Sequence, residues 1–134
     1  MISKKTEQDM KGWVRCNGKN THKYNHDLNE NSIVIELGGY TESWAASIKK
    51  ECYVYVLEPV EKFYNILKHK YLSRKKIVIL NFGISVEEKV SFIDKKELDG
   101  NATRLLNLSE KNDSGEKIEL ITLEKLMEDN KLTR

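Results

Sequence analysis

The order of apolar and polar residues along the chain predicts short buried strands that alternate with helices. Three runs rich in β-branched residues, Ile33–Leu37, Tyr53–Leu57 and Ile77–Leu80, are typical of buried strands. Between them, apolar residues recur at helical spacing in Glu42–Lys50 and in the segment that begins at Pro59. Such a β-α-β-α-β order requires parallel strands joined by right-handed crossovers.

Two further strands are predicted in the C-terminal part of the chain, at Val90–Ile93 and Ile118–Ile121. The segment between them, Asp94–Lys117, is rich in Asn, Asp, Lys and Gly, so we expect a long exposed loop. Thr122 can cap a last helix, because its side-chain oxygen can accept a hydrogen bond from a backbone N–H of the first turn.

These patterns divide the chain into an N-terminal arm and one domain. Residues 1–31 are polar and weakly periodic, which predicts a helical or irregular arm. Residues 32–134 predict an α/β fold with three parallel strands, an additional pair of strands and flanking helices. The length of 134 residues lies within the usual range of a single domain.

Charge and cysteine content narrow the expected partners. The 23 basic and 21 acidic side chains are interspersed, whereas a nucleic-acid-binding protein gathers its positive charge in a patch. No apolar run could span a bilayer, and the first ten residues lack the apolar core of a signal peptide. Cys16 and Cys52 have no metal-ligand spacing, so we expect reduced thiols and no metal. We therefore expect a cytoplasmic protein with no nucleic-acid or membrane partner.

Residues suited to a nucleoside follow each of the three strands in turn. Ligands of open α/β sheets bind at the carboxyl ends of the strands. Gly38 and Gly39 allow close approach of the backbone, and the Glu58 carboxylate can accept both hydroxyls of a ribose. Asn81 and Phe82 suit the edge and the face of an adenine. Each residue alone is commonly structural, but their order on successive strand ends favours a nucleoside site.

The glycine spacing distinguishes between classes of nucleoside cofactor. A dinucleotide fingerprint, Gly-x-Gly-x-x-Gly, would need glycine at Tyr40 and at Ser43 if it began at Gly38. A Gly-x-x-x-x-Gly-Lys phosphate loop is also absent from the sequence. A nicotinamide-dependent oxidoreductase is therefore the least favoured interpretation.

Several motifs resemble those of the FkbM family of class I methyltransferases. Val34–Trp44 is similar to the first motif of the class, and Val54–Pro59 resembles the family's Phe-Glu-Pro element. Asn81–Ser85, Val90–Phe92 and Ile121–Leu123 continue the family's pattern in order. The resemblance covers most of the chain, and the motifs as a set are fairly specific.

The resemblance implies a partial Rossmann-like sheet that binds S-adenosylmethionine and transfers its methyl group to a small-molecule acceptor, commonly a hydroxyl of a sugar or natural product. By position, the implied cofactor-binding residues are Glu36, Gly38, Gly39 and Tyr40 at the methionine end, Glu58 at the ribose, and Asn81 and Phe82 at the adenine. No catalytic residue is implied, and none of the histidines, His22, His26 and His69, is assigned a role. His69 is expected to be exposed.

The sequence departs from the family in two respects. Glu42 stands where the family usually has glycine, and its bulk and charge are expected to disturb the cofactor loop. The sequence ends at Arg134, before the family's fourth strand, so we expect a truncated domain that self-associates or needs a completing partner chain. The alternative is a non-catalytic Rossmann-like binding or interaction module.

Overall fold

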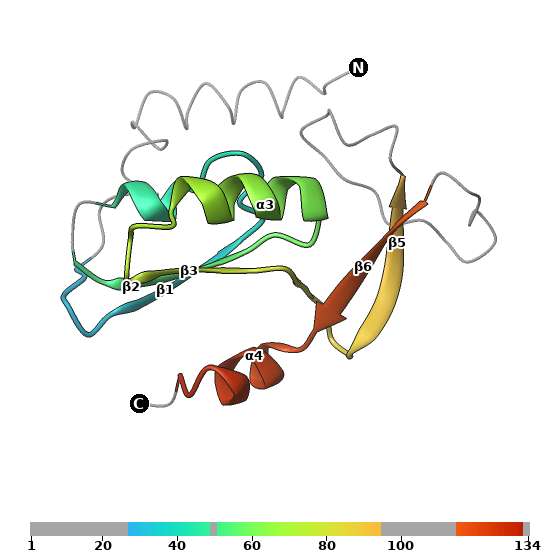
Figure 1. Ribbon diagram of the computed structural model, residues 1–134. Coiled ribbons are helices and arrows are strands. Elements are labelled where there is room, and N and C mark those ends of the chain that lie inside the picture. The colour runs from blue at the N-terminus through green and yellow to red at the C-terminus, as the bar shows by residue number, and fades with distance from the viewer. Residues whose placement is uncertain (1–26, 49–50, 95–114, 133–134) are drawn as a thin grey trace, which may run out of the picture.

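The computed structural model describes residues 27–48, 51–94 and 115–132, which form two three-stranded sheets and their helices (Figure 1). In chain order the elements are β1 (Ile33–Leu37), the 3₁₀ helix η1 (Ala45–Ser47), β2 (Tyr53–Leu57), α3 (Glu61–Lys70), β3 (Ile77–Leu80), β4 (Gly83–Ile84), β5 (Lys89–Asp94), β6 (Gly115–Ile121) and α4 (Leu123–Asp129). The predicted α/β class is confirmed. The N-terminal arm lies outside the described residues except for residues 27–31.

The first sheet has the order β1-β2-β3, with β2 in the middle. Both pairings are parallel, with Val34 opposite Val54 and Val54 opposite Ile77. The three strands have the bounds that the apolar runs predict. Because the strands are parallel, their carboxyl ends meet at one edge of the sheet, which is where a ligand of this architecture binds.

Helix α3 covers one face of the first sheet (Figure 1). It begins at Glu61, two residues after Pro59, and its first backbone hydrogen bond runs from Tyr64 N–H to the Val60 carbonyl. Apolar residues spaced by three or four positions place Phe63 and Leu67 on the buried face. The Leu67 side chain packs into the core of the first sheet and is fully buried.

The helix expected over Glu42–Lys50 is wrong over the described residues of that segment. A single 3₁₀ turn forms at Ala45–Ser47, and Ile48 is already extended, with φ −61° and ψ 124°. The apolar spacing that predicted a helix is satisfied by this one turn, which buries Ala45 and Ala46. Residues 49–50 lie outside the described residues.

The second sheet has the order β4-β6-β5, one strand more than the expected pair. The additional strand β4 pairs parallel with the end of β6, Gly83 lying opposite Leu120. Strand β6 begins at Gly115, so the last residues of the predicted Asp94–Lys117 loop are strand. Antiparallel pairing with β5, which extends to Asp94 opposite Gly115, overrides the turn-forming composition there. Residues 95–114 lie outside the described residues.

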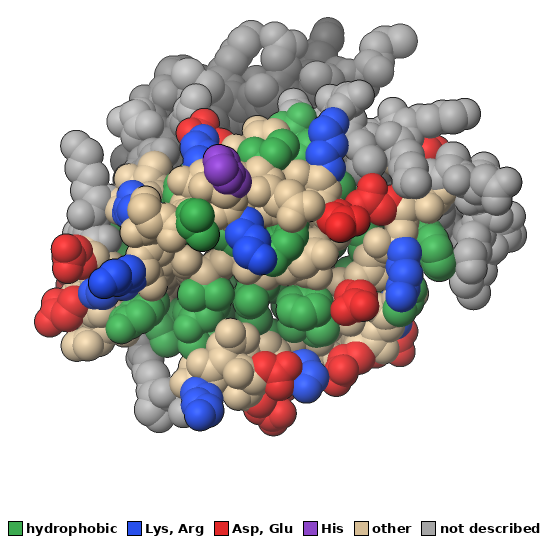
Figure 2. Space-filling view, viewed as in Figure 1, with side chains coloured by type: hydrophobic (Ala, Val, Ile, Leu, Met, Phe, Trp, Pro, Cys, Tyr) green, Lys and Arg blue, Asp and Glu red, His purple; other side chains and the backbone are tan. Residues whose placement is uncertain are grey.

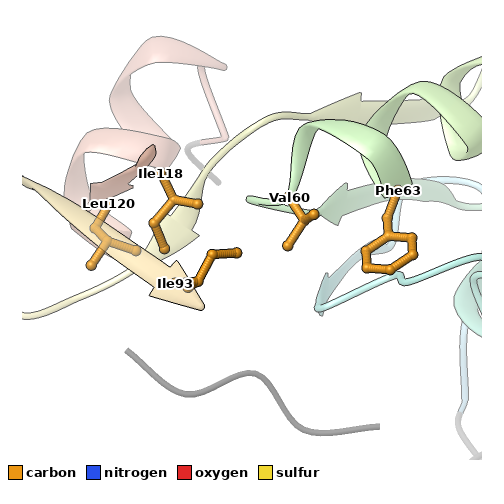
Figure 3. Close-up of a cluster of buried hydrophobic side chains, with 5 residues drawn as sticks. All are labelled: Val60, Phe63, Ile93, Ile118 and Leu120. Carbon is orange, nitrogen blue, oxygen red and sulfur yellow. The ribbon is translucent and has the colours of Figure 1, made fainter. Parts of the chain in front are cut away.

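A cluster of buried apolar side chains joins the second sheet to the start of α3. It consists of Val60, Phe63, Ile93, Ile118 and Leu120 (Figure 3). Glu116 of β6 also accepts a hydrogen bond from Glu61 N–H, at 3.0 Å, in the first turn of α3. These contacts hold the second sheet beside the carboxyl ends of the first.

The surface is mixed in charge and apolar in places. On the face seen in Figure 2, acidic and basic side chains are interspersed rather than segregated. Ile33, Leu37 and Tyr53, on neighbouring strands of the first sheet, are 41%, 62% and 44% exposed. No helix in the described part of the chain is long and apolar enough to cross a membrane.

Candidate nucleoside site at the strand ends

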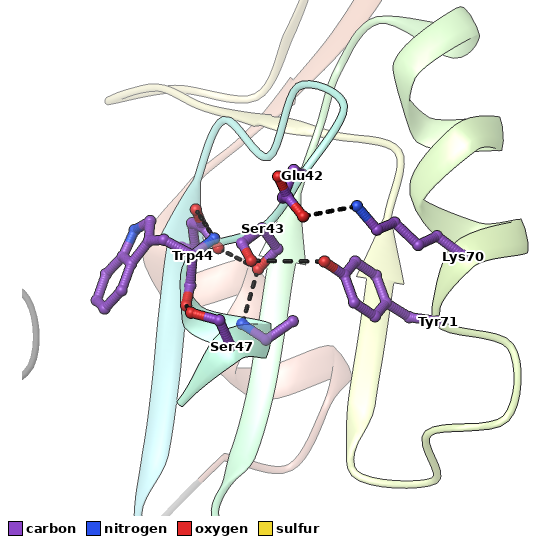
Figure 4. A network of polar contacts seen from close by, with 8 residues as sticks. Glu42, Ser43, Trp44, Ser47, Lys70 and Tyr71 are labelled. Atoms are coloured by element: carbon purple, nitrogen blue, oxygen red, sulfur yellow. Dashed lines mark hydrogen bonds and ion pairs between the residues drawn. The ribbon is translucent and has the colours of Figure 1, made fainter. Parts of the chain in front are cut away.

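Glu36 anchors the loop that follows β1. Its buried carboxylate accepts hydrogen bonds from the Ser43 hydroxyl and from the backbone N–H groups of Trp44 and Ala45, both at 3.2 Å. Ser43 Oγ in turn accepts from Ala46 N–H at 2.9 Å, and Figure 4 shows Ser43 and Trp44 in this polar network. The carboxylate therefore stabilises the conformation of the loop through these hydrogen bonds. Glu36 does not line the cavity at Glu58 that is described below.

Gly38 and Gly39 are required for two different reasons. Gly38 has φ +84°, which residues with a Cβ rarely adopt, although a Cβ there would meet no atom within 4 Å. Gly39 has no such dihedral, but a Cβ there would lie 2.5 Å from Val56 Cγ1 and 2.6 Å from Leu67 Cδ1. One glycine allows the turn and the other allows the loop to pack on the core.

Tyr40 also has a left-handed backbone, with φ +49°. Few residues other than glycine adopt this conformation, and it persists where the surroundings determine it. Here the Tyr40 ring lies 4.4 Å from that of Phe63 on α3, between centroids, and its N–H donates to Glu58 Oε2 at 2.8 Å. The loop is therefore attached to α3 by a ring contact and to the end of β2 by a hydrogen bond from the Tyr40 N–H to the Glu58 side chain.

Glu58 is the central polar residue of the strand ends. It is 4% exposed, and its two oxygens accept one backbone hydrogen bond each, from Tyr40 to Oε2 and from Val60 to Oε1 at 3.0 Å. Each carboxylate oxygen can accept about two hydrogen bonds. Within the described residues these are the only hydrogen bonds of the carboxylate, so both oxygens keep the capacity to accept a second donor, such as a ligand hydroxyl.

A cavity of about 300 Å³ lies at Glu58. Gly38 and Glu58 line it from the first sheet, and Gly83, Ile93 and Leu120 line it from the second. The sequence patterns did not indicate this apolar wall, because they predict no ligand-facing role for the second sheet. Gly83 is the residue in the sequence that could have indicated it, since a glycine in a strand can mark a close approach of another strand. A Cβ there would lie 2.5 Å from Leu120 Cδ2, so glycine allows β4 to approach β6 closely.

Asn81 and Phe82 border a neighbouring cavity of about 340 Å³. The Asn81 side-chain nitrogen donates to the backbone carbonyls of Glu58, at 2.9 Å, and Pro59, at 3.2 Å. Within the described residues no hydrogen bond is made by Asn81 Oδ1, which can still accept one. The two cavities adjoin, since Pro59 and Ile118 line both.

Glu42 points away from the cavity and pairs with Lys70 of α3 at 2.8 Å (Figure 4). The hydrogen bond and charge of Lys70 lower the pKa of Glu42, and the same hydrogen bond raises the pKa of Lys70. The Glu42 side chain is 74% exposed. The expected disturbance of the cofactor loop by Glu42 therefore has no basis in this geometry.

Replacement of Glu42 by glycine is expected to leave the affinity of the candidate nucleoside site unchanged, because Glu42 lines neither cavity of the site. Isothermal titration of the variant with S-adenosylmethionine tests this, with Glu42→Gln as the control that keeps the side-chain length. Tighter binding by the glycine variant would contradict the geometry.

The Glu42–Lys70 ion pair should stabilise the fold slightly at pH values above the ordinary pKa of glutamate. This contribution should disappear as the pH falls through the lowered pKa of Glu42.

Of the predicted site residues, the structure brings Gly38 and Glu58 to one cavity and Asn81 and Phe82 to the adjoining one. Glu36, Gly39 and Tyr40 instead stabilise the loop that follows β1. His69 is exposed on α3, as expected, whereas His22 and His26 lie outside the described residues. Comparisons with protein-family models, with curated proteins and with solved structures found no match.

Proposed function

We propose that this chain binds S-adenosylmethionine at the carboxyl ends of β1, β2 and β3, as part of a methyltransferase that acts on a hydroxyl of a sugar or natural product. The observation that carries the proposal is the buried Glu58 carboxylate. It lines the cavity, and each of its oxygens retains the capacity to accept a hydrogen bond from one hydroxyl of a ribose.

The surroundings of Glu58 support a nucleoside with an apolar neighbour on one side. Ile93, Ile118 and Leu120 form an apolar wall of the Glu58 cavity, and buried surroundings strengthen a charged hydrogen bond. Asn81 Oδ1 in the adjoining cavity can accept a hydrogen bond from an exocyclic amino group. The FkbM resemblance implies ribose at Glu58 and adenine at Asn81 and Phe82.

Methyl transfer also needs a group that positions the acceptor, and a partner can supply it. Among the described strands, β1 pairs only with β2, so its other edge is available to a strand of a second copy or another chain. This edge strand carries Ile33 and Leu37, whose side chains are 41% and 62% exposed. The proposed function therefore includes association with a copy of this chain or with a completing partner.

Glu58→Gln tests the proposed ribose contact, because the change removes the charge and replaces one acceptor oxygen with a donor. We expect calorimetric titration to show S-adenosylmethionine binding weakened by roughly 1.5–3 kcal/mol, as for hydrogen bonds to charged groups. Circular dichroism establishes that the variant is folded, since Tyr40 and Val60 share this carboxylate. Glu124→Gln, on the exposed surface of α4, is the matched control and should bind as wild type does.

The same titration with NAD as a second ligand tests the choice of cofactor. Saturable binding of S-adenosylmethionine, weakened in Glu58→Gln alone, supports the proposal. Equal affinity in wild type and Glu58→Gln would show that the ribose lies elsewhere, and preferential binding of NAD would favour an oxidoreductase.

A non-catalytic interaction module is the second candidate function. It is favoured by the hydrogen bonds of Glu36, Glu58 and the Asn81 amide, all of which already serve the backbone of the strand-end loops. Such a module would bind neither cofactor in the titration above. It would still associate with a partner through β1, which light scattering or pull-down with a second copy would detect.

A further inference from the structure

A third cavity, of about 440 Å³, lies at the opposite end of the first sheet from the candidate nucleoside site. Its floor is apolar and deeply buried, since Ala45, Ala46, Cys52 and Val54 are each at most 4% exposed. The volume falls in the range of small-molecule sites, about 300–1,000 Å³. The cavity can therefore hold the apolar part of a small ligand.

The rim of this cavity is basic and fixed in position. Ser73, Arg74, Lys75 and Lys76 belong to the turn between α3 and β3 and all line the cavity. Backbone hydrogen bonds hold this turn at both ends, from Arg74 N–H to the Tyr71 carbonyl at 2.9 Å and from Ile77 N–H to the Arg74 carbonyl at 3.0 Å. The backbone that carries the three cations is thus preorganised.

Two of the three cations on the rim have no partner among the described residues. Lys76 lies 4.0 Å from the Glu51 carboxylate and donates to the Glu51 carbonyl, so it neutralises the acid that also lines the cavity. Among the described residues, neither Arg74 nor Lys75 has an ion-pair or hydrogen-bond partner for its side chain. Lys70 and Lys125 elsewhere on the surface do pair with acids. Exposure of the turn to solvent would explain why it carries basic residues. It would not explain why these residues line a cavity whose floor is apolar.

We propose that this cavity binds a small organic phosphate monoester. The apolar group of the ester packs on the floor, and the phosphate lies at the rim. The charges of Arg74 and Lys75 match the two negative charges of the head group, and the planar guanidinium of Arg74 can bind two phosphate oxygens at once. The Ser73 hydroxyl adds a neutral donor.

The test uses hexyl phosphate as the probe, with inorganic phosphate and hexanol as its two halves. We expect saturable calorimetric binding of hexyl phosphate, weaker binding of inorganic phosphate and none of hexanol. The double variant Arg74→Gln/Lys75→Gln should weaken hexyl phosphate by at least about tenfold, the lower end for loss of one charge-assisted hydrogen bond. Both side chains are exposed, so the variant should fold.

The double variant Lys68→Gln/Lys131→Gln is the control, because it removes the same charge from exposed positions outside this cavity. It should bind hexyl phosphate as wild type does. The proposal is overturned if wild type shows no saturable binding, if both double variants lose affinity equally, or if Arg74→Gln/Lys75→Gln binds as tightly as wild type.

Discussion

Replacement of Glu36 by alanine is expected to lower the free energy of unfolding by several kcal/mol, since each buried donor that is left without an acceptor costs about 1–3 kcal/mol. The reason is that the Ser43 hydroxyl and the N–H groups of Trp44 and Ala45 lose their common acceptor in a buried loop. The whole stability of a domain is typically about 5–15 kcal/mol, so the variant should be barely folded at 25 °C.

Urea unfolding followed by tryptophan fluorescence measures this effect. Glu42→Ala is the matched control, since it removes a carboxylate from the same loop but from an exposed position, and its effect on unfolding should be small. Similar midpoints for the two alanine variants would mean that the Glu36 carboxylate does not hold the loop.

The two adjacent glycines of the loop should respond differently to asparagine. Gly38 needs only a left-handed backbone, which asparagine tolerates better than other residues with a side chain, so Gly38→Asn should retain most of the stability. Gly39→Asn should lose about 1–3 kcal/mol or more, as expected when a packed core is forced apart by atoms close to Val56 and Leu67.

Thermal unfolding by calorimetry separates these two mechanisms. Gly38→Ala provides a further comparison, because alanine has no polar side chain to support the left-handed backbone and should cost about 1–2 kcal/mol. If Gly39→Asn were as stable as Gly38→Asn, the steric explanation of Gly39 would be incorrect.

The first sheet could be predicted closely because its signals are local. Ile33–Leu37, Tyr53–Leu57 and Ile77–Leu80 are apolar runs bounded by turn-forming residues, and each strand has the predicted bounds. Strand β4 could not be predicted in this way, because its two residues, Gly83 and Ile84, are too few to show an apolar run or an alternation of apolar and polar positions. It is a strand only because β6 lies beside it.

The candidate site was predictable in position but not in detail. The sequence places Glu58 and Asn81 at strand ends, and both border cavities there. What a carboxylate faces depends on chain segments that fold back over it, such as Tyr40, eighteen positions away from Glu58. Spacing along the chain therefore could not reveal that Glu36 serves the loop and Glu58 serves both loop and cavity.

The sharing of one carboxylate by two amides has a consequence for hydrogen–deuterium exchange. Tyr40 is 39% exposed, yet its N–H can exchange with solvent deuterium only when it separates from Glu58, and the same condition applies to Val60. A ligand that also bonds to Glu58 would slow both amides together. The Tyr40 and Val60 signals in an NMR exchange experiment are therefore an internal reporter of occupancy at the strand ends.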